Sequence, residues 1–403
     1  MKLSDVKEVV VVGGGGHIGL PLGIVLANLG HKVTALDLNS QVVELINSGE
    51  MPFLEDGAED ALKKALASSR FRATTDQRVI SSAEVVIICI GTPVDEHMSP
   101  VPRIFNELLD GLKPRLKQGQ LLILRSTVYP GTTRLAADNL AGLGIHLAFC
   151  PERILQGKAI EELGTLPNIV SGITQEAEQR ALSFFQDLGP VVLSSIEEAE
   201  FAKLFLNTYR YIEFATTNQL FTIANDAGVD YARILDIMKE EYPRASKIPK
   251  PGLTAGPCLM KDTMQLVAYS QNKFTLGYSA FFANEGMALY IVDNVLRQIN
   301  SSRPVIGLLG MAFKADNDDI RSSLSYRIRK AFQLTGATVL SADFHVSTDR
   351  TLVSEAEVIE KSEVVIICAP HKEYLSLDFK GKPVVDIWNI LGRGSLIRIS
   401  NGG

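Results

Sequence analysis

The feature that most constrains the fold of this chain is its amino-terminal stretch, KEVVVVGGGGHIGLPLGIVLANLGHKVTALDLN. An apolar run at 9–12 predicts a buried strand, which is followed by a glycine turn and a helical pattern that ends near Leu29. A second apolar run at 33–36 ends in Asp37. Because strand, turn, helix and strand in this order form a βαβ unit, the stretch predicts an α/β fold with a doubly wound parallel sheet.

The glycine turn indicates a dinucleotide site. Glycines in GxGxxG register let the backbone approach a pyrophosphate at a helix N-terminus, and an acid after the second strand accepts from a ribose 2′-hydroxyl. Positions 38–50 contain no lysine or arginine that would neutralise a 2′-phosphate, which favours NAD over NADP. The predicted cofactor site comprises Gly14, Gly16, His17, Ile18, Gly19 and Asp37.

Two further buried strands are expected in AEVVIICIGTP and QLLILRSTVYPGTT, each opening into a loop at its carboxyl end. Doubly wound sheets bind ligands at that edge, so Thr92 and Thr127 are assigned to the cofactor site as well. Near the other terminus RPVIGLLGMAF, GATVLSADFH and SEVVIICAPHKEY repeat the pattern without a full GxGxxG. This predicts a second Rossmann-like domain that holds a different ligand.

Between the two Rossmann-like patterns the sequence is helical. EEAEFAKLFLNTYRYIEFATTNQLFTIANDAG contains no proline, stops at Gly228 and spreads apolar side chains widely around one long helix. Such a helix favours a homodimer, while a purely internal bridging role remains open. The expected domains are 1–195 for the cofactor, 196–301 for the helices and 302–403 for the second Rossmann-like domain.

Charge and composition restrict the partners. No apolar run approaches the roughly 20 residues of a membrane span, and the start of the chain lacks the pattern of a signal peptide, so we expect a cytoplasmic protein. A net charge of −6 argues against nucleic acid as a partner. Four widely spaced cysteines without CxxC predict neither a disulfide framework nor a metal site.

One cysteine stands apart, in the stretch TAGPCLMKDTMQL. Cys89, Cys150 and Cys368 end apolar runs, whereas Cys258 follows a glycine and a proline and precedes Lys261 and Asp262. If Pro257 occupies the first helical position, Cys258 lies in the first turn, where the helix dipole favours a thiolate. We predict an activated nucleophile; the alternative is a buried cysteine beside a solvent-facing Lys–Asp pair.

Three other polar residues have candidate roles in catalysis. Lys203 and Asn207 are four apart on the long helix, where they are suited to hold an oxyanion or a water, or else form a solvated stripe. Glu152 follows a strand and a proline, a suitable place for a general base, although an exposed loop glutamate is the alternative.

Together these motifs resemble the UDP-glucose/GDP-mannose dehydrogenase family. The resemblance covers almost the whole chain and rests on VVGGGGHIGLPL, GTPVDE, STVYPGTT, PERILQGK, AEFAKLFLNTYR, GPCLMKDT, an Asn-Glu pair at 284–285 and GMAFKADNDDIRSS, in this order. It implies an NAD-binding first domain, a dimerising middle and a nucleotide-sugar-binding last domain. It also implies oxidation of the C6 alcohol of the sugar to a carboxylate, with two NAD and a cysteine thioester.

The resemblance also implies roles for individual residues. Cys258 matches the nucleophile, and Glu152 matches a glutamate implicated as general base. Residues matching those that position water and stabilise the oxyanion are Lys203, Asn207 and Asp262, with Thr127 in the same polar network. Lys261 and Arg321 match cofactor-contacting positions, and Lys314 matches a lysine that holds the sugar nucleotide.

The substrate is indicated less directly. PERILQ, with Arg153, resembles the branch that acts on UDP-N-acetyl-D-mannosamine, whereas CLMKDTMQL is more typical of UDP-glucose members. The remaining substrate-binding candidates are Arg244 and Gly252. The preferred substrate is therefore UDP-N-acetyl-D-mannosamine, with UDP-glucose or UDP-N-acetylglucosamine as alternatives. A two-electron NAD dehydrogenase and a non-catalytic sensor of NAD or nucleotide sugar are the other classes considered.

Overall fold

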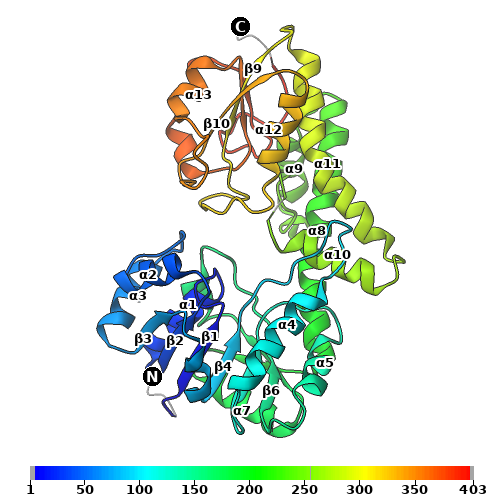
Figure 1. The fold of residues 1–403 in the computed structure, drawn as a ribbon. Helices are drawn as coiled ribbons and strands as arrows, with labels where there is room; N and C mark the ends of the chain where they lie inside the picture. The colour runs from blue at the N-terminus through cyan, green and yellow to red at the C-terminus, as the bar shows by residue number, and fades with distance from the viewer. Residues whose placement is uncertain (1–4, 255, 400–403) are drawn as a thin grey trace. The chain divides into compact units, whose positions relative to one another are not determined.

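The computed structural model of the chain describes residues 5–254 and 256–399 (Figure 1). It divides into two compact units, Met1–Leu206 and Asn207–Gly403. The boundary falls inside helix α8 (Ile196–Asp226), so the central helices group with the carboxyl-terminal sheet. The three functional domains expected from the sequence stay a prediction, because the division into units follows contacts and not ligands.

The first unit is built on an eight-stranded sheet in the order β3-β2-β1-β4-β5-β6-β7-β8. All neighbouring strands are parallel except β6 and β7, which are antiparallel. The strands are β1 (Glu8–Val12), β2 (Lys32–Leu36), β3 (Phe71–Thr74), β4 (Val85–Ile88), β5 (Leu121–Leu124), β6 (His146–Phe149), β7 (Asn168–Gly172) and β8 (Val191–Leu193). The doubly wound sheet predicted from the sequence is confirmed.

Both faces of this sheet are covered, as the continuous apolar strands require. Val9 and Val11 belong to one buried cluster, whereas Val10 and Val12 belong to another, because successive side chains of a strand point to opposite faces. The helices of this unit are α1 (Gly19–Leu29), α2 (Ser40–Ser48), α3 (Ala58–Ala67), α4 (Pro102–Leu112), α5 (Thr132–Asn139), α6 (Ala159–Glu162) and α7 (Gln175–Gln186).

The second unit contains a four-stranded parallel sheet in the order β10-β9-β11-β12. Its strands are β9 (Val305–Leu309), β10 (Thr338–Ala342), β11 (Val364–Ile367) and β12 (Val384–Val385). Its other helices are α9 (Tyr231–Lys239), α10 (Leu259–Tyr269), α11 (Thr275–Gln298), α12 (Leu324–Leu334) and α13 (Glu355–Lys361). The second Rossmann-like pattern of strand, helix and strand is thereby confirmed.

Helix α8 is 31 residues long, and Gly228, with φ +71°, follows its end. Tyr211 and Ala215 pack against Ala280 of α11, so one side of α8 is buried within the second unit. Another side is exposed and apolar, and includes Tyr209, Leu220 and Ile223. Among the described residues, no helix combines the length and apolarity that crossing a membrane requires.

Candidate functional site

The glycine turn between β1 and α1 forms a cradle that fits a dinucleotide. The backbone N–H groups of Gly13 and Gly14 donate to the Leu36 carbonyl at 2.9 and 3.0 Å. A Cβ on Gly14 would lie 2.6 Å from the Ala35 Cα, and one on Gly19 would lie 2.3 Å from the Gly13 oxygen. These two glycines let strand, turn and helix approach closely, as a pyrophosphate site at the N-terminus of α1 requires.

Gly16 and Asp37 are two residues of this cradle that are predicted to meet the dinucleotide. A Cβ on Gly16 would meet only the Gly13 oxygen, at 3.5 Å, so this turn position is open. The half-buried Asp37 accepts from the backbone N–H of Gly15 at 2.9 Å through Oδ2 and from that of Asn39 at 3.1 Å through Oδ1. Each carboxylate oxygen has a further lone pair to accept from a ribose hydroxyl.

We expect Asp37→Ala to weaken NAD binding at least several-fold, because it removes a charge-assisted acceptor whose contribution is about 1.5 to 3 kcal/mol. The variant also releases the Gly15 N–H from its carboxylate partner. Asp37→Asn is the matched control, since its amide oxygen still accepts from Gly15 while the charge is lost. Titration of NAD by isothermal calorimetry measures both variants, and unchanged affinity in Asp37→Ala would mean that the ribose is held elsewhere.

The other predicted cofactor residues of the first unit lie around the turn or at the carboxyl ends of strands. Ile18 is the N-cap residue of α1. The His17 ring packs against the Phe53 ring with centroids 3.9 Å apart and the planes tilted by 38°, and its Nδ1 lies 3.0 Å from the Gln156 amide nitrogen. The Thr92 hydroxyl donates to the Thr127 carbonyl, which joins the loops after β4 and β5. The structure therefore brings Thr92 and Thr127 together, as their positions in the sequence predicted.

Glu152 lies in a buried ion pair that the sequence analysis did not identify. Its Oε2 accepts from Nε of Arg125 at 2.8 Å and from a terminal nitrogen of the same guanidinium, and its Oε1 accepts from the backbone N–H groups of 153 and 154. The exposed side-chain fractions are 1% for Arg125 and 9% for Glu152. The exposed loop glutamate considered as an alternative is therefore wrong. A general base role requires that the carboxylate exchange one of these donors for the substrate.

Arg125 directly follows the apolar strand LLIL. A charged residue next to a buried strand is the sequence signal that could have identified this ion pair. Its guanidinium also donates to the Cys150 carbonyl and the Asn168 side chain, both at 3.2 Å, so it links three segments beside the sheet. Arg153, predicted to contact substrate, donates to the Pro167 carbonyl within the same unit.

In the second unit Cys258 is exposed and is the N-cap residue of α10. The expectation that Pro257 occupies the first helical position is wrong, because the helix begins one residue after the cysteine, at Leu259. The Asp262 N–H donates to the Cys258 carbonyl at 2.9 Å, which closes the first turn. The sulfur thus remains at the end of the helix where the dipole favours an anion.

Asp262 is the buried centre of a polar cluster beside this cysteine. Its Oδ1 lies 2.7 Å from Nζ of Lys261, and its Oδ2 accepts from Nδ2 of Asn207 at 2.5 Å. The exposed side-chain fractions are 14% for Lys261 and 1% for Asp262, so a solvent-facing Lys–Asp pair, the alternative reading of the sequence, is wrong. Lys203 lies one turn before Asn207 on α8 and is half-buried.

The segment that leads to Cys258 is fixed by buried amides. The Gly252 N–H donates to Oδ1 of Asn218 at 2.9 Å, and a Cβ on Gly252 would lie 2.2 Å from the Trp388 ring. Nδ2 of Asn218 donates to Oδ1 of Asn284 at 2.9 Å, and Asn284 donates to the Tyr211 carbonyl at 3.0 Å. Gly252 therefore positions this segment through its close packing. Asn218 lies in the middle of a helical pattern, where nothing in the sequence indicated that its side chain holds another segment.

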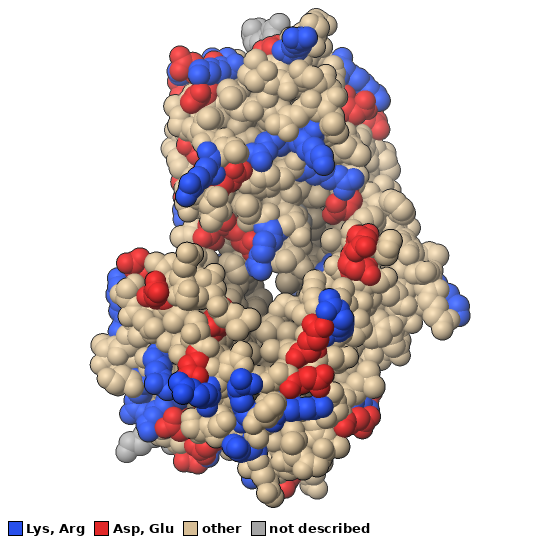
Figure 2. All heavy atoms as spheres, in the orientation of Figure 1, with Lys and Arg blue, Asp and Glu red and all other residues tan. Residues whose placement is uncertain are grey.

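The predicted basic residues of the second unit have partners of different kinds. Asp319 accepts from Nε and a terminal nitrogen of Arg321, and this hydrogen bonding raises the pKa of the guanidinium. Nζ of Lys314 lies 5.8 Å from the centroid of the Phe313 ring, and Arg244 lies over the Tyr242 ring at 4.9 Å. On the face shown in Figure 2, basic and acidic side chains are interspersed over each unit.

The doubly wound sheet, the glycine cradle and Asp37 define a dinucleotide-binding protein of the Rossmann class. Residues 7–187, 197–283 and 307–393 match the NAD binding, central and UDP binding domains of the UDP-glucose/GDP-mannose dehydrogenase family. The chain belongs to this family and is an NAD-dependent nucleotide-sugar dehydrogenase.

Individual relatives agree with this assignment over nearly the full length. The chain is 29% identical to a UDP-N-acetyl-D-mannosamine dehydrogenase of Methanococcus maripaludis, over 96% of this chain and 94% of the relative. The solved structure of a UDP-D-ManNAc dehydrogenase from Pyrococcus horikoshii has a TM-score of 0.85 at 27% identity and covers 93% of each chain. A UDP-glucose dehydrogenase structure from Pyrobaculum islandicum, with a TM-score of 0.86 at 24% identity over 99% of this chain and 96% of that one, shares the fold.

Proposed function

We propose that this protein oxidises the C6 hydroxyl of a UDP-hexose to a carboxylate in two steps, each with one NAD, through a thioester on Cys258. The observation that carries the proposal is the exposed cysteine at the start of α10, one turn from a buried Asp262 that is paired with Lys261 and Asn207. A binding module has no use for a nucleophile in these surroundings, which argues against a non-catalytic sensor.

The chain's own residues account for the chemistry between the two oxidations. After the first oxidation, the Cys258 thiolate adds to the aldehyde carbon and forms a thiohemiacetal, whose oxyanion is held by Lys203 and Asn207. Bound NAD supplies the oxidising power, accepting two electrons in each step. The second oxidation leaves a thioester. A water positioned by Asp262 then forms a C–O bond to the thioester carbon, the C–S bond breaks, and the carboxylate and the thiolate are released while the two protons of the water pass to solvent. A covalent intermediate of this kind keeps the aldehyde from escaping to solvent.

The preferred sugar in this proposal is N-acetyl-D-mannosamine. The PERILQ sequence around Arg153 supports it, as do the names of the relatives. UDP-glucose and UDP-N-acetylglucosamine are the alternatives, since CLMKDTMQL resembles UDP-glucose members. The division into 1–195 for NAD, 196–301 for dimerisation and 302–403 for the nucleotide sugar belongs to the same proposal.

A panel of UDP- and GDP-hexoses, assayed for NADH released per sugar consumed, tests the proposal. UDP-N-acetyl-D-mannosamine is expected to give the highest kcat/KM and two NADH per sugar. One NADH per sugar would indicate a two-electron dehydrogenase in which Cys258 is structural. Binding of NAD and UDP-sugar without turnover of any compound would indicate a non-catalytic sensor.

The proposal includes a homodimer that buries the exposed apolar side of α8. Tyr209 and Ile223 have exposed fractions of 63% and 65%, and such surface on a long helix is typical of a subunit interface. We expect Ile223→Lys to shift the protein toward the monomer in size-exclusion chromatography with light scattering. Leu334→Lys, at an equally apolar and 79% exposed position on α12, is the matched control and should leave the mass unchanged. A wild-type monomer would contradict this part of the proposal.

A further inference from the structure

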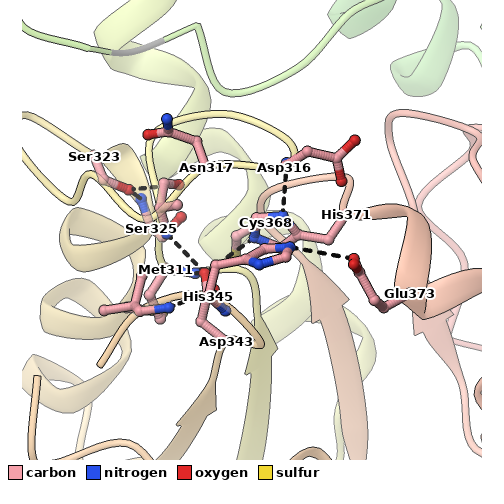
Figure 3. A network of polar contacts seen from close by, with 12 residues as sticks. Met311, Asp316, Asn317, Ser323, Ser325, Asp343, His345, Cys368, His371 and Glu373 are labelled. Atoms are coloured by element: carbon pink, nitrogen blue, oxygen red, sulfur yellow. Dashed lines mark hydrogen bonds and ion pairs between the residues drawn. The ribbon is translucent and has the colours of Figure 1, made fainter. Parts of the chain in front are cut away.

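The loop that follows β9, residues 310–323, is fastened to the sheet by two buried side chains. Oδ2 of Asp343 accepts from the backbone N–H groups of 311 and 312, at 2.6 and 2.9 Å, and Nδ1 of His371 accepts from that of Asp316 at 2.9 Å. Asp343 and His371 also contact each other at 3.1 Å, and both side chains have an exposed fraction of 0% (Figure 3). The start and the middle of the loop therefore depend on one buried pair.

These contacts define the tautomer of His371. Because Nδ1 accepts from an N–H group, the ring proton of the neutral imidazole lies on Nε2, from which it is donated to Oδ2 of Asp343. The other carboxylate oxygen accepts from the N–H groups of His345 and Val346 at 2.8 and 3.2 Å. Asp343 therefore holds the tautomer in which His371 can accept from the loop.

The same place gathers side chains of the kinds that bind metal ions. Ligand atoms of Asp316, His345, His371 and Glu373 lie within 4.8 Å of one another. Both nitrogens of His371 already have hydrogen-bond partners, so this residue offers no lone pair to a metal ion. The geometry points to a hydrogen-bonded support for the loop.

The loop reaches the segment that carries the nucleophile. A Cβ on Gly256 would lie 2.7 Å from the Phe313 ring, and Gly256, with φ +108°, takes a conformation that few other residues adopt. Its N–H also points to the Ser322 carbonyl at 3.5 Å. The position of the loop therefore determines the path of the chain two residues before Cys258.

We propose that His371 is a positioning residue of the UDP-sugar site, which fixes the loop bearing Lys314 and, through Phe313, the approach to Cys258. The roles of Lys314 and Cys258 rest on the proposed function. The hydrogen bonds of the His371 side chain run to the backbone N–H of Asp316 and to the Asp343 carboxylate (Figure 3), so it acts through the backbone of the loop. Its loss weakens binding of the nucleotide and leaves the NAD site of the first unit unchanged.

Alkylation of Cys258 tests this inference without turnover. Burial raises the pKa of the Cys89, Cys150 and Cys368 thiols to about 12, so iodoacetamide near pH 8 reacts with Cys258, which peptide mass spectrometry verifies. The UDP concentration that halves the alkylation rate reports nucleotide binding. We expect His371→Leu to raise this concentration about tenfold, since it leaves a loop N–H and a carboxylate without a partner.

Two further variants separate the loop contact from general damage. His371→Asn places an amide oxygen where Nδ1 stands, and is expected to recover most of the UDP protection. His31→Leu is the matched control, because His31 is buried in the first unit and its Nδ1 accepts from the Lys7 N–H at 3.1 Å. It should lose a similar hydrogen bond and keep the wild-type protection.

Unchanged UDP protection in a folded His371→Leu variant, or an equal loss in His31→Leu, would overturn the inference. If His371→Leu does not fold, as judged by NAD binding, His371→Gln decides, because its amide nitrogen can donate to Asp343 in place of Nε2 while the acceptor at Nδ1 is lost. Wild-type protection in His371→Gln overturns the inference. Wild-type Cys258 that UDP does not protect overturns it as well. If the wild-type protein shows UDP protection but no turnover, the proposed oxidation fails while the inference about His371 stands. The two failures are therefore distinguishable.

Discussion

Replacement of Cys258 by serine is expected to lower carboxylate formation by at least on the order of 10³-fold, because a hydroxyl does not replace a thiolate as nucleophile and leaving group. The fold should tolerate the change well. Cys258 is exposed and is the N-cap of α10, a position that favours serine. Mass spectrometry of the UDP-sugar acid measures the loss, and calorimetric titration with NAD should give the wild-type affinity.

The matched control for this variant is Cys150→Ala, which removes a fully buried thiol from the first unit. It should retain the oxidation at a small cost in stability, since a buried cysteine behaves as a small apolar side chain. Intact acid production by Cys258→Ser would remove the thioester from the mechanism. Accumulation of aldehyde by this variant would support it, because the first oxidation does not require the sulfur.

The sheets could be predicted from the sequence because their strands are buried on both faces. Continuous apolar runs such as that in EVVIIC, which spans both β4 and β11, indicate parallel strands without any knowledge of contacts. The cofactor cradle could equally be predicted from the sequence, since Gly14, Gly19 and Asp37 are fixed relative to each other within one βαβ unit.

The polar contacts that support the site could not be predicted from the sequence in the same way. Arg125 and Glu152 are 27 residues apart, and only the adjacency of β5 and β6 brings them together. Asp343 and His371 follow β10 and β11, on either side of β9, so their contact depends on strand order and not on spacing. The start of α10 was expected at Pro257 but lies at Leu259, because a proline indicates a helix end only approximately.

The largest expected effect on stability comes from Asp262→Ala. This carboxylate, with a 1% exposed side chain, holds the Lys261 ammonium at 2.7 Å and the Asn207 amide at 2.5 Å. Removing one partner of a buried pair leaves the other charge uncompensated, which lowers the free energy of unfolding by about 3 to 5 kcal/mol. Scanning calorimetry should therefore show a lower melting temperature for the second unit.

Two comparisons isolate the cause of that loss. Asp262→Asn still accepts from Asn207 but removes the negative charge beside the Lys261 ammonium, so its destabilisation should fall between those of wild type and Asp262→Ala. Asp293→Ala breaks an exposed i,i+4 pair with Arg297 on α11, where the expected cost is below about 1 kcal/mol. If Asp262→Ala costs no more than Asp293→Ala, the cluster beside Cys258 is solvated in solution. The Asn207 amide would then be unavailable as a fixed donor to the oxyanion.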